Sequence, residues 1–138
     1  MKLDWDFIRE LLICVEEDRN VFAGFPKAPL WADQSESDFM QEMAAHQKLE
    51  GRLFGHLELL LENDFLAGIS VHRDLSGGYH YSVHSPRLTL RGHELLADLR
   101  SKELWERVKS LAKNKGIELT FDAIKALGKV ALRQIIGE

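Results

Sequence analysis

The sequence predicts a mainly α-helical domain with one small antiparallel β element. Apolar side chains recur at helical spacing through most of the 138 residues. One stretch, residues 69–84, alternates apolar and polar side chains around a glycine-containing turn, as a β-hairpin does. Shortly after it, Thr89 is placed to cap the start of a helix.

The amino-acid composition limits the classes of protein to which the chain can belong. Hydrophobic residues make up 45% of the chain and charged residues 29%, as in a globular domain that buries a core. The formal net charge of −4 does not suggest a dedicated nucleic-acid binder. Cys14 is the single cysteine, so the chain has no disulfide framework. Because we find neither a signal-peptide pattern nor an apolar run of membrane-spanning length, we expect a cytoplasmic protein without membrane attachment.

The first helix and the loop after it fill the N-terminal quarter. Asp4 can cap a helix that continues to about Asp18. Residues 20–34 are expected to form a loop, with a short strand near 30–32. The apolar side chains of this loop either anchor it to the core or form a partner-docking surface. They are Phe22, Phe25, Leu30 and Trp31.

Two further helices are expected before the hairpin. Ser35 or Ser37 begins the second helix, which ends near Lys48, and the third covers 52–63. A joint at 50–51 contains a glycine and separates them. Two helices with such a joint, followed by a strand, match the order of a helix-turn-helix. The expected buried stripe of the second helix is Phe39, Met40, Met43 and Ala44.

The hairpin has a predicted register. If Arg73 lies opposite Tyr79, His72 faces His80, and the polar side chains share one face. Pro86 is expected to end the ladder, because proline cannot donate to it. The polar face then consists of Ser70, His72, His80, Ser82 and His84. We interpret the histidines as a solvent-facing pair, with a weak metal contact or a pH-sensitive contact as the alternative.

Three helical segments are expected after the hairpin. Gly92 is a poor helix former one turn into the first of them, so we expect it to let another backbone come close. Ser101 restarts or continues the helix, which ends at Gly116. Thr120 caps the last helix.

Four runs of residues, which together cover most of the chain, carry a resemblance. They are Met1-Lys2-x-Asp4 with the helix that continues through Glu16-Glu17, His56-Leu57-x-Leu59-Leu60 leading into Asp64-Phe65-Leu66, Leu88-Thr89-Leu90-Arg91-Gly92 through Arg100 with Trp105 after it, and Leu119-Thr120-Phe121-Asp122-x-Ile124-Lys125. In this order they resemble a family of small winged-helix proteins of unknown function that is frequent in bacterial prophages and mobile elements. The sequence departs from the pattern at Gly55, where an aromatic residue is expected before the histidine.

The resemblance implies a domain organisation. A winged helix-turn-helix domain would occupy residues 1–100, and a C-terminal helical extension, residues 101–138, would pack on the same domain. The hairpin would be the wing. The family has no assigned activity or catalytic residues. We also find no Ser-His-Asp order, P-loop or glycine-rich dinucleotide turn, so we expect no enzymatic activity and no cofactor. Two histidines without a third ligand do not make a structural zinc site, so we expect no metal.

The fold analogy suggests a DNA-binding transcriptional regulator of a prophage or mobile element. Its third helix would enter the major groove of double-stranded DNA, and its wing would contact the phosphate backbone. The residues expected to bind DNA are Arg52 and His56 on the third helix and His72, Arg73 and His80 on the wing.

Charge favours a rival hypothesis. Residues 1–87 carry 8 Lys and Arg against 15 Asp and Glu, a net charge of −7, whereas residues 88–138 carry +3. Phosphate contacts supply much of the affinity for DNA, so an acidic third helix is a poor reading helix. The alternative is a protein-interaction module that binds another protein through the acidic third helix or the aromatic loop, without binding DNA. The C-terminal helices could also form a homodimer face, with Trp105, Val108, Ile135 and Ile136 as candidates.

Overall fold

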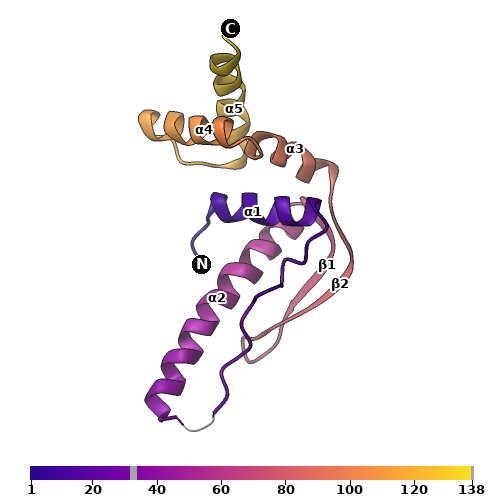
Figure 1. Ribbon diagram of the computed structural model, residues 1–138, viewed down its shortest axis with the longest axis vertical. Helices are drawn as coiled ribbons and strands as arrows, with labels where there is room; N and C mark the ends of the chain where they lie inside the picture. Colours follow the sequence, from indigo (N-terminus) through magenta and orange to yellow (C-terminus); the bar gives the residue numbers. More distant parts are fainter. Residues whose placement is uncertain (32–33, 138) are drawn as a thin grey trace.

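The computed structural model describes residues 1–31 and 34–137. These residues form five helices and a two-stranded antiparallel sheet, so the mainly α class with a small β element is confirmed. The elements are α1 (Trp5–Glu16), α2 (Glu36–Glu62), β1 (Leu66–Arg73), β2 (Tyr79–Leu88), α3 (Leu90–Leu99), α4 (Lys102–Lys115) and α5 (Phe121–Ile136). Figure 1 shows α2 and the hairpin running side by side below α1, with α3, α4 and α5 gathered above it.

The core lies where α1 meets the C-terminal half of α2, the base of the hairpin and the three later helices. Its most deeply buried side chains come from all of these helices, and they include Leu12, Leu57, Leu95, Leu96, Leu99, Trp105, Val108 and Ile124. Burial of this apolar surface is the main force that holds the elements together. None of the described helices is both long enough and apolar enough to cross a membrane.

The prediction of two helices between residues 35 and 63 is wrong, because α2 is one continuous helix of 27 residues. Ser35 caps it by accepting a hydrogen bond from the Asp38 amide at 3.1 Å. Gly51 lies inside the helix. A glycine costs about 1 kcal/mol in a helix, and the packing of Leu53, Leu57 and Leu60 in the core outweighs that cost. The helix-turn-helix order expected from the sequence is therefore not formed by this segment.

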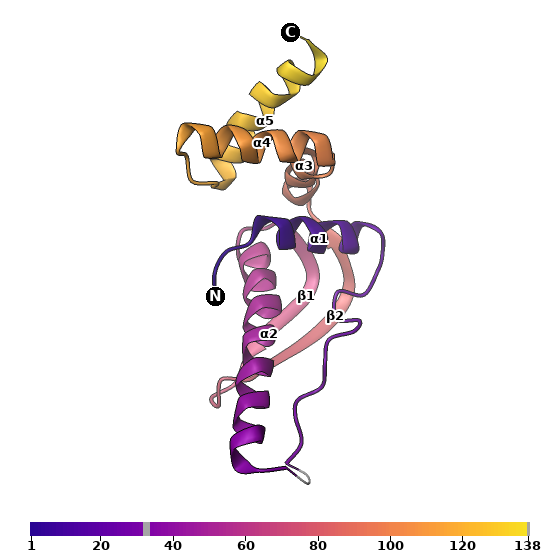
Figure 2. The same ribbon diagram turned by 60° about the vertical axis from the view of Figure 1, so that its left-hand side comes forward.

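The N-terminal half of α2 projects beyond the core. Figure 2 shows it continuing past the end of the hairpin, together with the chain that precedes it. The predicted buried stripe is wrong for this reason: Phe39 and Met43 are only half-buried, and Met40 and Ala44 are exposed. Of the strand expected near 30–32, Leu30 and Trp31 have no regular structure, and Ala32 lies outside the described residues.

The hairpin has the predicted register. Arg73 pairs with Tyr79 and His72 with His80, and the pairing continues in step to Ile69 and Val83. The expectation that Pro86 ends the ladder is wrong. Beyond a bulge, the strands pair again as far as Leu66 and Leu88, in their last residues.

The bulge explains how proline fits within β2. Three residues of β2, 84–86, lie opposite the single residue Gly68, so the Pro86 nitrogen is not required in the ladder. Gly68 and Ser85 take positive φ values of 83° and 57°. A β-carbon on Gly68 would meet the backbone carbonyl of Ser85, so only glycine fits there.

The predicted helix caps are confirmed. Asp4, Thr89 and Thr120 each accept a hydrogen bond from an amide in the first turn of their helix, and Ser101 starts a new helix in the same way. Gly116 ends α4 in the left-handed conformation, with φ of 65°.

Gly92 has the predicted use. The backbone carbonyl of Phe65 lies directly where a Gly92 β-carbon would be. The same carbonyl accepts a hydrogen bond from the Thr89 amide at 3.2 Å. The first turn of α3 is therefore seated on the start of the sheet.

Replacing Gly92 and replacing Gly51 by alanine should change the free energy of unfolding in opposite directions. Gly92→Ala forces the new methyl group against the Phe65 carbonyl and should lower the free energy of unfolding by about 3 kcal/mol, at the upper end of overpacking costs. Gly51→Ala is the control, because open space surrounds that position. Within a continuous helix it should raise the free energy of unfolding by about 0.5–1 kcal/mol. Urea denaturation measures both changes. A destabilised Gly51→Ala variant would contradict an uninterrupted α2.

Candidate functional site

His56 lies in the core and not on a DNA-facing surface. Its side chain is fully buried. The Asp4 amide donates to Nε2 at 2.9 Å, and Nδ1 lies 2.6 Å from the Arg52 carbonyl. Since the amide can only donate, Nε2 is the acceptor, and Nδ1 carries the proton of a neutral ring. His56 therefore fastens the N-terminus to α2 and has no surface to offer to a nucleic acid, which corrects the expectation that it contacts DNA.

Arg52 is exposed, but its charge is matched. Its guanidinium lies 3.1 Å from a carboxylate oxygen of Asp4 and 4.1 Å from the ring centre of Phe7. Partial burial raises the pKa of Asp4, but the hydrogen bond from the Phe7 amide and the nearby Arg52 guanidinium together hold this pKa below its ordinary value. This pair adds to the attachment of the N-terminus.

The residues predicted for a wing lie on the hairpin and face solvent, and two of the three, Arg73 and His80, are paired with acids. Arg73 binds both carboxylate oxygens of Glu58, the closer nitrogen at 2.8 Å from Oε1. His80 lies 3.0 Å from Asp74. His72, opposite His80, is exposed. Asp74 belongs to the hairpin turn that the sequence predicts, whereas Glu58 comes from α2, and the hairpin register alone gave no signal of it.

The five predicted site residues therefore separate into two groups. Arg52 and His56 lie at the N-terminal attachment of α2, and the other three lie on the hairpin. Arg52, Arg73 and His80 are each within 3.1 Å of a carboxylate. The geometry thus joins basic side chains to acids instead of lining up a positive surface for phosphates.

The residue runs that carried the family resemblance contact one another. The sulfur of Met1 lies where a β-carbon on Gly55 would be, so the start of the first run packs on α2 beside His56. Trp5 donates its indole N–H to the Leu119 carbonyl at 2.9 Å. Phe121 packs against Phe65 with 5.1 Å between ring centres. These runs therefore join the elements of the fold.

Trp105 is part of the same framework. It is buried, and its indole N–H donates to Asp6 at 2.7 Å. Val108 is also fully buried. The expectation that these two residues form a homodimer face is wrong, because they pack within the core. Ile136 is exposed and Ile135 half-buried, so the end of α5 keeps an accessible apolar surface.

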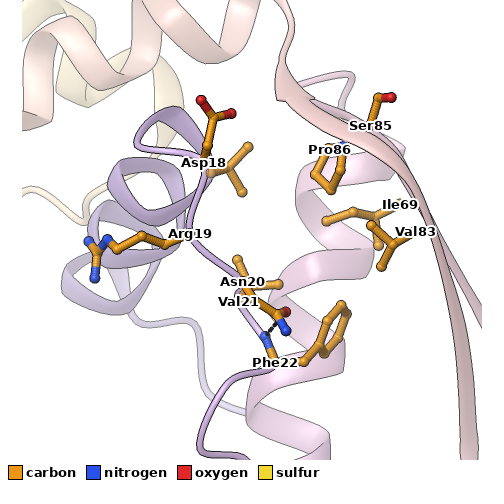
Figure 3. A pocket seen from close by; sticks show the side chains of 10 residues that line it. Asp18, Arg19, Asn20, Val21, Phe22, Ile69, Val83, Ser85 and Pro86 are labelled. Atoms are coloured by element: carbon orange, nitrogen blue, oxygen red, sulfur yellow. Dashed lines mark hydrogen bonds between the residues drawn. The ribbon is translucent and has the colours of Figure 1, made fainter.

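A cleft of about 480 Å³ lies between the chain after α1 and the bulge of β2. Figure 3 shows Ile69, Val83 and Pro86 on one side of it and Val21 and Phe22 on the other, with Arg19 pointing away. Its remaining lining residues are Val15, Asp18, Asn20 and Ser85. The predominantly apolar walls suit an apolar group of modest size and supply no nucleophile with an adjacent base.

The described residues do not form a cluster of metal-binding side chains. Within the described ranges, 1–31 and 34–137, His, Cys, Asp and Glu side chains nowhere gather in a group of three or more that could hold a metal ion.

The aromatic loop confirms the first hypothesis made for it, because part of it anchors to the core, whereas the partner-docking surface stays a prediction. Phe22 is buried and stacks on Tyr81 with 3.7 Å between ring centres, so this part anchors the loop. Leu30 is 78% exposed and Trp31 62% exposed, so the other part is a surface. Trp31 packs on Phe39 of α2, with ring centres 5.0 Å apart.

We call the projecting segment the arm and define it as residues 26–31 and 34–47. Besides Leu30 and Trp31, it exposes Met40, which is 62% accessible. Residues 36–47 contain three carboxylates and no lysine or arginine, and the loop part adds one lysine, Lys27. In the part of the chain that the structure describes, these carboxylates have no ion-pair partner. They are Glu36, Asp38 and Glu42. The arm therefore exposes three large apolar side chains, and Glu36 lies one helical turn from Met40.

The comparisons with known proteins give one family and one relative. A family model described as a hypothetical protein, DUF2513, matches residues 2–118, which include α1 to α4 and stop before α5. A Haemophilus influenzae protein described as uncharacterised is 28% identical over 137 residues, covering 99% of this chain and 100% of the relative. No solved structure matches the chain.

The contact of Asp6 with α4 predicts a pH dependence of stability. The Trp105 N–H, and then the Lys109 ammonium at 3.1 Å, hold the pKa of Asp6 below its ordinary value of 3.8. A carboxyl group whose pKa is lower in the folded protein stabilises the protein fully when the pH is above its ordinary pKa. This stabilisation is lost as the pH falls through the folded-state pKa.

Asp6→Asn should therefore lower the free energy of unfolding by about 1 kcal/mol at neutral pH, a small value because water screens this exposed carboxylate. The difference from the wild type should shrink as the pH is lowered below 3.8. Urea denaturation at several pH values measures it. Glu10→Gln, on the exposed side of the same helix, is the control and should have no effect. A difference for Asp6→Asn that persists unchanged at low pH would contradict the assignment.

Proposed function

The chain belongs to the DUF2513 family of hypothetical proteins, and we propose that it is a non-enzymatic protein-interaction module whose binding surface is the arm. The observation that carries this proposal is the exposure of Leu30, Trp31 and Met40 on a segment that projects from the core. Tryptophan is enriched in interface hot spots, and methionine is enriched at interfaces, because each can bury a large apolar area.

The chemistry of the arm indicates the kind of partner. Glu36 lies one helical turn before Phe39 and Met40, and Trp31 packs on Phe39, so this carboxylate lies beside the apolar side chains. A partner that offers apolar side chains and positive charge on one helical face would complement both features. Such a partner is a basic amphipathic helix of another protein.

The arm contributes little to the folded core. The core-forming residues of α2 begin with Leu53, whereas the exposed apolar side chains lie in its projecting half or before it. Polar substitutions on the arm should therefore leave stability close to that of the wild type, within about 0.5 kcal/mol. Binding and folding can be tested separately.

A synthetic amphipathic helix of leucine and lysine, carrying a fluorophore, tests the proposal by anisotropy. We expect the Trp31→Ser/Met40→Ser variant to bind at least about tenfold more weakly than the wild type, because two hot-spot side chains are removed. Leu75→Ser is the matched control, since Leu75 is fully exposed on the hairpin turn and is not part of the arm. Equal affinity for the wild type and the arm variant, or an equal loss in the control, would refute the arm as the binding surface.

DNA binding is the second candidate function, and the hairpin favours it. In this proposal β1 and β2 are the wing of a winged-helix regulator of a prophage or mobile element. His72, Arg73 and Arg87 are exposed on the strands and could reach phosphates. The paired states of Arg52 and Arg73 weigh against it.

Fluorescence anisotropy with a random-sequence duplex decides this candidate. A DNA binder should bind at micromolar concentration in about 50 mM salt and lose most of its affinity at about 200 mM, because bound phosphates release counterions. Arg73→Ala should weaken such binding, and Lys27→Ala, in the arm, should not. Absence of binding at the lower salt concentration, with protein well above micromolar, excludes the hairpin as a DNA-binding wing.

A further inference from the structure

Another cleft lies between the N-terminal residues, the middle of α2 and α4. Its volume is about 660 Å³, which is within the range of small-molecule sites. Figure 2 shows the N-terminus lying beside α2, just below α1. Trp5 and Leu119 supply apolar wall, and the Trp5 indole N–H donates to the Leu119 carbonyl at 2.9 Å, which holds the ring in place. We call this cavity the N-terminal cleft and define it by residues 1–6, 47, 48, 51, 52, 109 and 119.

Both acids that line the N-terminal cleft are already paired with cations that line it too. Asp4 lies 3.1 Å from the guanidinium of Arg52. Asp6 lies 3.1 Å from the ammonium of Lys109. These two pairs together leave the cleft without net charge.

Two further lysines therefore make the cleft positive. Lys2 and Lys48 line it, and both are exposed. Within residues 1–31 and 34–137, neither of them has an ion-pair partner. Residues 1–87 hold only eight lysines and arginines, and three of these eight line this one cleft. The negative group of a ligand would thus meet uncompensated positive charge here.

Gly51 leaves space at the wall of the N-terminal cleft. It lies within α2, where a glycine costs about 1 kcal/mol relative to alanine. Beyond its own turn of helix, no atom of the described chain lies within 4 Å of the place of a Gly51 β-carbon, so close packing does not require glycine there. Because Gly51 lines the cleft, a larger side chain would take up part of its volume. A glycine in this position lets a ligand come close to the helix backbone.

We propose that the N-terminal cleft binds a small organic anion that carries a flat apolar ring. Lys2 and Lys48 contact the negative group of this ligand. The ring packs on Trp5 beside Gly51, where no side chain competes for the space. The cleft and the arm share Gln47, but the inference does not rest on the proposed function of the arm.

Titration with anilinonaphthalene sulfonate, an anionic dye with a flat apolar ring system, tests the site by fluorescence. We expect the wild type to bind this dye at micromolar concentration, as a ligand of its size can. Gly51→Leu should weaken binding at least about tenfold, because the new side chain occupies the cleft. Ala97→Leu is the control, since it adds the same side chain to an exposed position of α3. A wild type that does not bind the dye, or equal binding by Gly51→Leu, overturns the inference.

Removal of the two lysine charges tests the recognition of the anion. Lys2→Gln/Lys48→Gln should weaken binding of the sulfonate at least about tenfold. Phenylnaphthylamine, a neutral dye with the same ring system, should bind this variant as it binds the wild type. Lys102→Gln/Lys115→Gln removes two exposed charges of α4 outside the cleft and is the control. An equal loss in both lysine variants, or no loss in either, overturns the proposed role of Lys2 and Lys48.

Amide chemical shifts in the NMR spectrum locate the bound sulfonate dye. We expect shifts at residues 2–6 and 47–52, which form or adjoin the N-terminal cleft. Binding in the apolar cleft beside the bulge of β2 would instead shift residues 20–22 and 83–85. Shifts confined to that second set overturn the inference.

Discussion

The fold depends on the seating of α3 upon the backbone carbonyl of Phe65. That carbonyl fills the space of the missing Gly92 side chain and accepts the Thr89 amide. Because the hairpin and α3 are fixed to each other there, α4 and α5 follow at a set position above α1. Trp105 can then reach Asp6 on α1, and Trp5 the Leu119 carbonyl. Contacts between residues about 100 positions apart thus follow from one close approach of two backbones.

Local chemistry was sufficient to predict the hairpin and the helix caps. The alternation around Asp74–Gly78 allows one register that keeps Ile69 and Val71 on the core side, so a single pairing follows from the sequence. Thr89 and Gly92 each have a narrow structural use, and the structure assigns both as expected. The continuity of α2 could not be predicted in this way, because the cost of Gly51 is local whereas the packing that outweighs it comes from the whole core.

The candidate site was harder to predict because contacts between residues distant in the sequence decide it, as they decide the continuity of α2. His56 is polar and was expected on a reading helix, yet the Asp4 amide and the Arg52 carbonyl satisfy both of its nitrogens inside the protein. Only the three-dimensional course of the N-terminus reveals these partners. The arm was also only half predicted. The aromatic residues of the loop suggested either an anchor or a docking surface. Phe25, which contacts Phe54, belongs to the anchor, whereas Leu30 faces solvent and docking there stays a proposal.

Residues of the family runs hold the elements together, and the projecting arm is the surface that we propose binds a partner. Hydrogen–deuterium exchange measured with and without the leucine–lysine peptide tests this division most directly. Exchange in residues 36–47 should slow when the peptide is added, while exchange in the hairpin and in α3 stays unchanged. Slowing confined to the hairpin, or no effect of the peptide, would contradict the account.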